Sequence, residues 1–127
     1  MSSSTVALNE SNFEATVKGG IVLIDWWAQW CAPCRAFAPV FEAAATRHTD
    51  VTFAKVDTDA AQGLAQAFDI RSIPTLMLFR EGVLLFAQPG MLPAAAIDEL
   101  LEKARTLDMA EVHAEIAARQ AAGPQGA

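Results

Sequence analysis

The sequence predicts an α/β fold in which a central mixed β-sheet is flanked by helices on both faces. Short apolar strand patterns alternate with helical patterns along most of the chain, and strands linked by helices run parallel. Near Arg80-Glu81-Gly82, a tight turn joins two further strand patterns into a hairpin, which adds antiparallel strands. The chain has 127 residues and is 53% hydrophobic, which fits one globular domain with a substantial core.

The elements are expected in the order strand, helix, strand, helix, strand, helix, hairpin, helix. Strands are predicted over residues 5–8, 21–28, 51–56, 75–79 and 83–87. Ser11 and Glu14 have capping-box spacing, so a helix should open there and end before Gly19-Gly20. A second helix should follow the cysteines as far as Ala45, with Pro39 kinking it rather than ending it.

The later helices are predicted from their first residues. Asp59 should cap a helix that runs to residue 68, and Pro93 suits the first turn of a helix that ends near Arg105. Asp108 should open a final helix with a narrow apolar stripe, formed by Leu107, Met109, Val112 and Ile116. This stripe either folds back on the domain, which we favour, or docks a partner or a second copy. We expect a domain over residues 1–105, a helical extension over 106–122 and a disordered tail over 123–127.

Cys31 and Cys34 carry the clearest chemical signal. They lie where a buried strand turns into a helix, and Cys31 falls at or near the helix N-cap. Free backbone N–H groups and the helix dipole stabilise a thiolate there, and Pro33 suits the first turn. A zinc site is the weaker alternative, because zinc needs about four ligands and His48 and His113 show no paired spacing. The pattern predicts thiol–disulfide exchange and no metal.

Asp25 lies within the apolar strand before the cysteines. It is either a solvated strand end or, as Ile24 and Trp26 suggest, a partly buried acid. Burial would raise its pKa and make it a proton acceptor near Cys34. Lys55 alternates with apolar residues in its strand, a pattern that on its own indicates a surface lysine.

The run Asp25-Trp26-Trp27-Ala28-Gln29-Trp30-Cys31-Ala32-Pro33-Cys34-Arg35, with Ile73-Pro74-Thr75 later, resembles the thioredoxin family. The likeness covers roughly residues 5–105. It implies that the predicted mixed sheet with helices on both faces is a thioredoxin fold. Ala32 stands where the family usually has Gly, Trp26 where it usually has Phe or another apolar residue, and the extension after Arg105 is a further departure.

The resemblance implies roles for several residues. Asp25 would lie beneath the disulfide and assist Cys34, with Lys55 as its partner. Pro74 would be cis and would face the cysteines, although trans is the default for an X–Pro bond. The backbone of Ile73 would then pair with an extended substrate segment. An apolar substrate-binding collar would comprise Trp30, Pro33, Ile73, Pro74, Gly90 and Met91, with Trp27 in the core instead.

The implied activity is reduction of disulfides in protein substrates through a mixed disulfide on Cys31 that Cys34 resolves. No Gly-rich fingerprint for NADPH or flavin is present, so a separate thioredoxin reductase would supply the electrons, without a bound cofactor. Oxidase or isomerase activity is one alternative, and a partner-binding or holdase module that uses the C-terminal helix is another.

The charge and the N-terminal sequence limit location and partners. A net charge of −6 offers no basic surface for nucleic acid or membranes. The N-terminus lacks the apolar segment of a signal peptide, and no apolar run is long enough to span a bilayer. These features favour a cytoplasmic protein, and in that reducing compartment a cysteine pair is more often catalytic than structural.

Overall fold

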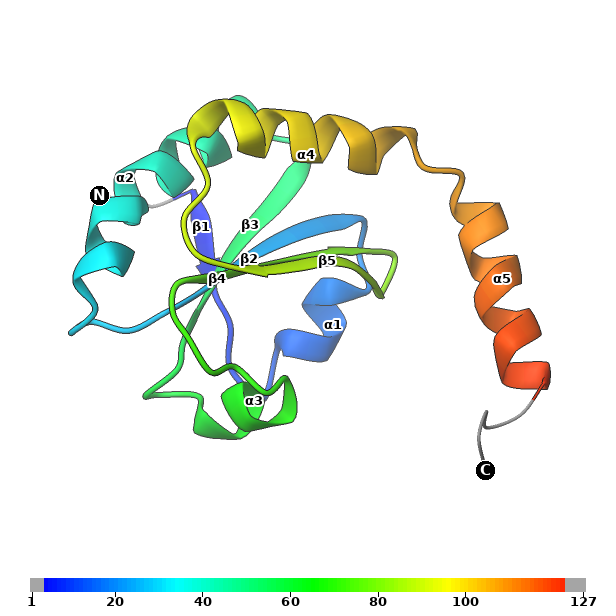
Figure 1. The fold of residues 1–127 in the computed structure, drawn as a ribbon, viewed down its shortest axis with the longest axis horizontal. Coiled ribbons are helices and arrows are strands. Elements are labelled where there is room, and N and C mark those ends of the chain that lie inside the picture. Colours follow the sequence, from blue (N-terminus) through cyan, green and yellow to red (C-terminus); the bar gives the residue numbers. More distant parts are fainter. Residues whose placement is uncertain (1–3, 123–127) are drawn as a thin grey trace.

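The computed structural model describes residues 4–122, which form five strands and five helices in the predicted order (Figure 1). The strands are β1 (Thr5–Ala7), β2 (Ile21–Trp27), β3 (Val51–Asp57), β4 (Thr75–Arg80) and β5 (Val83–Pro89). The helices are α1 (Phe13–Val17), α2 (Ala32–Arg47), α3 (Gln62–Ala67), α4 (Ala94–Thr106) and α5 (Met109–Ala121). The tail predicted over 123–127 lies outside the described residues.

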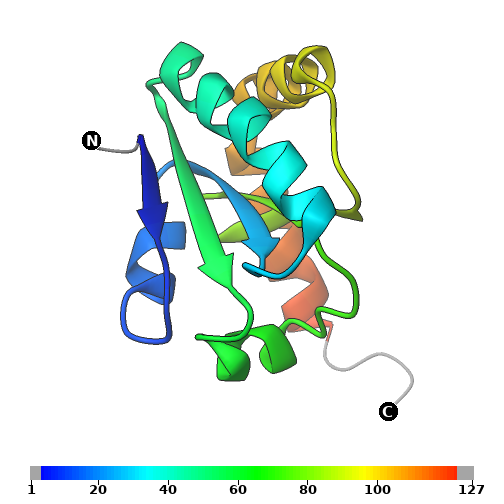
Figure 2. The same cartoon turned by 90° about the vertical axis from the view of Figure 1, so that its left-hand side faces the viewer.

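The strands form one mixed sheet in the order β1-β3-β2-β4-β5. β3 runs parallel to both β1 and β2, whereas β4 is antiparallel to β2 and to β5. Helices α2 and α4 cover one face of the sheet, and α1 and α3 cover the other (Figures 1 and 2). The predicted mixed sheet with helices on both faces is confirmed.

Strand β2 lies at the centre of this sheet and is buried on both sides. Successive side chains of a strand point to opposite faces. Accordingly, Leu23 packs in the cluster beneath α2 and α4, while Val22, Ile24 and Trp26 pack in the cluster beneath α1 and α3. Because β2 is the central strand, its C-terminal end and the cysteines that follow it lie in the middle of one end of the sheet.

Helix α2 begins immediately after Cys31 and runs without a break past Pro39 to Arg47. The prediction that Pro39 does not end the helix is confirmed. Its apolar side chains bury against the sheet: Phe37, Phe41 and Ala44. Because the helix is anchored along its length, its N-terminal turn is held in a fixed position over the end of β2.

Two predicted helix caps are wrong. Helix α3 begins at Gln62 with Ala61 as its N-cap, and the carboxylate of Asp59 instead accepts a hydrogen bond from the Trp30 indole. The N-cap of α1 is Asn12 rather than Ser11, and its side chain accepts from the Asn9 backbone N–H, outside the helix. In both loops, the capping side chain bonds elsewhere.

The extension folds back on the domain, which is the arrangement that we favoured from the sequence. Asp108 is the N-cap of α5 and accepts a hydrogen bond from the Glu111 N–H at 3.2 Å, so the predicted cap is confirmed. Within the stripe, Met109 is buried and Val112 and Ile116 are half-buried, while Leu107 stays 40% exposed.

Arg80, the last residue of β4, and Glu81 of the turn that follows it hold this extension. Arg80 Nη1 donates to the carbonyl oxygens of Ala104 at 2.7 Å and Leu107 at 3.1 Å. Glu81 Oε1 lies 2.8 Å from His113 Nε2. Helix α5 therefore lies beside the hairpin turn, at the opposite end of β4 from Pro74 (Figure 1).

Truncation after Thr106 should lower the free energy of unfolding by about 2 kcal/mol, because the burial of Met109 and the contacts with Arg80 and Glu81 are lost. Urea denaturation of the truncated and full-length chains measures this difference. Removing residues 123–127 alone serves as the control. Equal stability of the full-length and truncated chains would contradict the packing of α5 on the domain in solution.

Candidate active site

The cysteines occupy the junction between β2 and α2. Cys31 is the N-cap of α2 and forms a disulfide with Cys34, with their Cα atoms 5.2 Å apart. The backbone N–H of Cys34 points at the Cys31 sulfur, with an N to Sγ distance of 3.2 Å. A free N–H and the positive end of the helix dipole thus face Cys31, and both favour its thiolate once the disulfide is reduced.

The loop before β4 lies opposite the cysteines. Its Ile73–Pro74 bond is cis, as the resemblance implied. The Cys31 sulfur lies 3.7 Å from the Ile73 carbonyl oxygen, and the Pro74 carbonyl accepts a hydrogen bond from the Gly90 N–H at 2.8 Å. Segments around residues 31, 73 and 90 therefore meet at one end of the sheet.

The residues predicted for the collar differ in exposure. Trp30 is 68% exposed and Met91 44%, Pro33 and Gly90 are also exposed, Ile73 is half-buried and Pro74 is buried. Trp30 and Ile73 border a shallow hollow of about 170 Å³, which is completed by Thr58, Ile70, Arg71 and Ser72. These contacts bring Trp30, Ile73, Pro74 and Gly90 together, and the exposed Pro33 and Met91 lie next to them in the chain.

Two side chains that the sequence did not assign to the site hold the loop before Cys31. Asp59 Oδ2 accepts a hydrogen bond from Trp30 Nε1 at 2.8 Å. Arg35 Nη1 donates to the Gln29 carbonyl at 2.7 Å. The sequence gave no signal for Asp59 beyond its helix-capping type. Together these bonds fix the loop that presents Trp30 beside Cys31.

Asp25 is fully buried in β2, and neither of its carboxylate oxygens has a hydrogen-bond partner within residues 4–122. Burial raises the pKa of this carboxyl from 3.8 to about 7, against a smaller lowering by the positive charge of Lys55. The partly buried acid predicted from the sequence is thus fully buried. Near neutral pH it exchanges a proton readily, as a proton acceptor must.

Lys55 acts on Asp25 through its charge. The two residues are direct neighbours in the register of β2 and β3. The ammonium group, however, lies 3.9 Å from Glu42 Oε2 and 4.7 Å from the centre of the Trp27 ring. Trp27 is half-buried and packs against the cysteines and Ala28. Lys55 therefore lowers the pKa of Asp25 without a hydrogen bond to it.

Two other kinds of site are absent from the described chain. Within residues 4–122, no three His, Cys, Asp or Glu side chains gather closely enough to hold a metal ion. Over the same residues, no helix has the length and apolar character needed to cross a bilayer.

The burial of Asp25 predicts how stability depends on pH. Between 3.8 and about 7 the folded chain binds more protons than the unfolded chain, so stability falls as pH rises through this range. Asp25→Ala should therefore stabilise the oxidised protein by about 4 kcal/mol at pH 8, with little gain near pH 4. Denaturant unfolding of both proteins across this pH range tests the effect. A gain that did not vary with pH would rule out a raised pKa as its cause.

The amino-acid sequence is similar to a family model and to known relatives over most of its length. The thioredoxin family model matches residues 4–103. Putative thioredoxin 2 of Streptomyces coelicolor is 55% identical over 119 residues, covering 93% of this chain and 89% of the relative. Thioredoxin of Chlamydia trachomatis is 36% identical over 96 residues, covering 76% of this chain and 94% of the relative.

Solved structures give the same result. A mutant thioredoxin from Halobacterium salinarum superimposes with a TM-score of 0.72 at 33% identity, over 81% of this chain and 93% of that one. Plasmodium falciparum thioredoxin also reaches 0.72, at 27% identity, over 78% and 98%. With the Cys31–Cys34 pair in place, these matches identify a thiol–disulfide oxidoreductase that reduces protein disulfides, and a binding module without redox chemistry is not favoured. The chain belongs to the thioredoxin family.

Proposed function

We propose that Cys31 is the attacking cysteine and Cys34 the resolving cysteine in the reduction of protein disulfides. The position of Cys31 carries this assignment: it caps α2, where the Cys34 N–H points at its sulfur, and that sulfur lies 3.7 Å from the Ile73 carbonyl oxygen. Both cysteines are buried, Cys31 at 4% and Cys34 at 2% exposure, so the assignment rests on position: Cys34 lies inside the first turn of α2, whereas Cys31 caps the helix.

Two exchanges complete one turnover. The Cys31 thiolate attacks one sulfur of the substrate disulfide, and the other substrate sulfur leaves as a thiolate that takes up a proton. Cys34 then loses its proton and attacks the Cys31 sulfur, which releases the second substrate thiol and forms the Cys31–Cys34 disulfide. The substrate gains two electrons and two protons, and the cysteine pair loses them.

Asp25 would take the proton from Cys34 in the second exchange. Its pKa of about 7 leaves a substantial fraction of the carboxylate free to accept a proton at neutral pH. Lys55 would be a positioning residue that keeps this pKa from rising further. Without Lys55, burial alone would hold Asp25 protonated over more of the working pH range.

Substrate recognition would use an extended segment of the partner protein. The Ile73 backbone is well placed to pair with such a segment beside Cys31, in the manner of an added strand. Trp30, Pro33, Pro74, Gly90 and Met91 would contribute an apolar rim of low relief around it. Contacts of this kind accept many sequences, which suits an enzyme that reduces diverse proteins.

Electrons would come from a thioredoxin reductase in the cytoplasm, with the disulfide itself as the one redox group and no bound cofactor. The Ala-Pro pair between the cysteines is closer to the Gly-Pro pair of reductants than to the polar pairs of oxidants. Residues 1–105 would carry all of this chemistry, and the extension over 106–122 would be dispensable for it.

Substitution of each cysteine tests the assignment. Cys31→Ser should abolish insulin reduction with a thioredoxin reductase, whereas Cys34→Ser should accumulate a mixed disulfide with the substrate, because the resolving thiol is gone. Mass spectrometry identifies the trapped species. Trapping on the Cys31→Ser protein would reverse the roles, and a folded wild-type chain without turnover would favour the holdase alternative.

Lys55→Met should shift the pH dependence of turnover. Removing the positive charge lets the pKa of Asp25 rise above about 7, so the acidic limb of the rate profile should move to higher pH. Steady-state insulin reduction at a series of pH values measures the shift. Lys103→Met on α4 is the matched control and should leave the profile in place. An unchanged profile in the Lys55 variant would remove Lys55 from the mechanism.

A further inference from the structure

Three methionines lie within residues 4–122, and they differ in exposure. Met77 packs in the core beneath α1 and α3 and is 5% exposed, and Met109 is 6% exposed at the start of α5. Met91, in the loop after β5, is 44% exposed. A thioether that is open to solvent can meet a dissolved hydroperoxide, which converts it to a sulfoxide. Among these three sulfur atoms, that of Met91 is therefore the one that such an oxidant reaches most easily.

The backbone on both sides of Met91 is held in place. Gly90 has a φ of +100°, which only glycine adopts without strain, and its N–H donates to the Pro74 carbonyl at 2.8 Å. Leu92 is half-buried against the core cluster beneath α2 and α4, and Pro93 is the N-cap of α4. The exposed Met91 side chain thus projects from a fixed loop.

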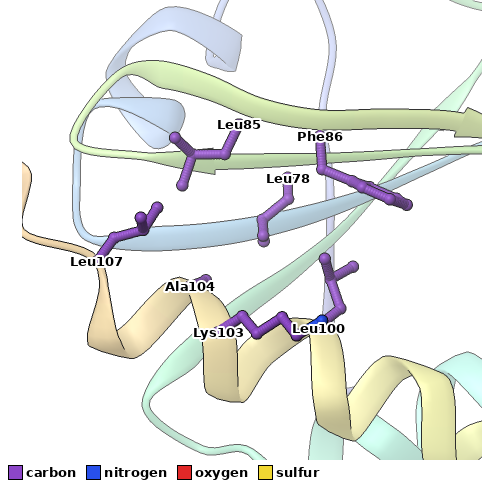
Figure 3. A pocket seen from close by; sticks show the side chains of 7 residues that line it. All are labelled: Leu78, Leu85, Phe86, Leu100, Lys103, Ala104 and Leu107. Carbon is purple, nitrogen blue, oxygen red and sulfur yellow. The ribbon is translucent and has the colours of Figure 1, made fainter. Parts of the chain in front are cut away.

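The two elements that this loop joins are packed against each other. Phe86 points from β5 toward α4, and Leu100 points back toward it (Figure 3). Both side chains also pack on the core cluster that contains Leu78. Because β5 and α4 belong to one packed body, the loop between them cannot easily turn Met91 away from the end of the sheet that carries the cysteines.

A chain of short contacts connects this loop to Cys31. The Cys31 sulfur lies 3.7 Å from the Ile73 carbonyl oxygen, and the next residue, Pro74, accepts the hydrogen bond from Gly90. Met91 follows Gly90 directly and belongs to the apolar rim of the proposed function. The inference below rests on that role of the rim in binding protein substrates.

We propose that Met91 is an oxidation-sensitive position of this rim: a hydroperoxide converts its thioether to the sulfoxide, and the modified rim binds protein substrates more weakly. The sulfur takes up the terminal oxygen of the hydroperoxide as the O–O bond breaks, and the proton of that oxygen passes to the other oxygen, which leaves as an alcohol or, from hydrogen peroxide, as water. The thioether loses two electrons and the hydroperoxide gains them. The Cys31–Cys34 disulfide has no thiol that could react instead, so the step occurs on the oxidised chain.

The effect should fall on large substrates and leave the exchange chemistry intact. A sulfoxide is polar, so the oxidised side chain no longer offers an apolar contact. A protein substrate covers the rim as well as Cys31, whereas the small disulfide cystine needs little more than the Cys31 sulfur. We expect kcat/KM for insulin to fall about fivefold, which corresponds to about 1 kcal/mol, and the rate with cystine to stay the same.

Peptide mapping after treatment of the oxidised chain with hydrogen peroxide tests the site. Trypsin cleaves after Lys and Arg, so Met77, Met91 and Met109 fall in separate peptides, over residues 72–80, 81–103 and 106–119. The peptide over 81–103 should be the first of these three to gain an oxygen atom. Earlier oxidation of Met77 or Met109 would overturn the proposal.

Insulin reduction with a thioredoxin reductase, measured after removal of the peroxide, tests the consequence. Each protein is compared with its own untreated sample. The wild-type chain should lose about fivefold in kcat/KM and regain it after incubation with methionine sulfoxide reductases and dithiothreitol. Met91→Leu should keep its own starting rate through the treatment. Met109→Leu is the matched control, because it removes a buried methionine, and it should respond as the wild type does.

The outcomes separate this inference from the proposed function. A wild-type chain that keeps its rate with Met91 fully oxidised, an equal loss in Met91→Leu, or an equal loss with cystine would overturn the inference alone. An untreated wild-type chain that does not reduce insulin would overturn the proposed function, and this inference with it.

Discussion

Asp25 lies in the centre of the sheet without a hydrogen-bond partner among the described residues, and a folded chain keeps such a group only if the surrounding core is strong. The core meets this condition because β2 is packed on both faces, by α2 and α4 on one side and by α1 and α3 on the other. The same packing excludes water from the carboxyl and raises its pKa to about 7. Burial of the Asp25 carboxyl therefore both lowers the stability of the folded chain and lets this group exchange a proton at neutral pH.

The position of α2 depends on the same strand. Cys31 follows β2 by four residues and is itself the N-cap of the helix, so the reactive sulfur occupies a position at which most helices carry an oxygen. Its contact with the Cys34 N–H satisfies a backbone donor that the helix cannot satisfy internally. Helix capping and thiolate stabilisation are thus served by one atom, and a change at Cys31 affects both.

Local patterns in the sequence were sufficient for the elements and much of the site. The apolar run before the cysteines, the helical spacing after them and the turn at Glu81 predicted the strands, helices and hairpin that the structure contains. The wrong prediction at Asp59 has a different origin. Its carboxylate bonds the Trp30 indole, 29 residues away, and a local capping rule contains no information about so distant a partner.

What the sequence could not predict at Lys55 and Pro74 also has a physical reason. Strand register places Lys55 beside Asp25, but the direction of a long, flexible side chain depends on Glu42 and Trp27, which come from other segments. The cis form of the Ile73–Pro74 bond came from the family resemblance, because the residues around it favour no such conformation. Sequence patterns therefore located the site, and contacts between distant segments determined how each side chain acts in it.

The extension illustrates how an element can be added to this fold at low cost. The Streptomyces alignment spans 93% of the chain and must reach into α5, which begins at residue 109, whereas the Chlamydia alignment spans 76% of the chain and 94% of the relative. Arg80 bonds the carbonyl oxygens at the end of α4, which any helix of this length leaves without internal partners. Since the bond to Ala104 does not require α5, the extension adds only the Arg80 bond to Leu107, the burial of Met109 and the contact with Glu81. Its packing surface is at the hairpin turn, so its sequence can change without altering the geometry of the cysteines.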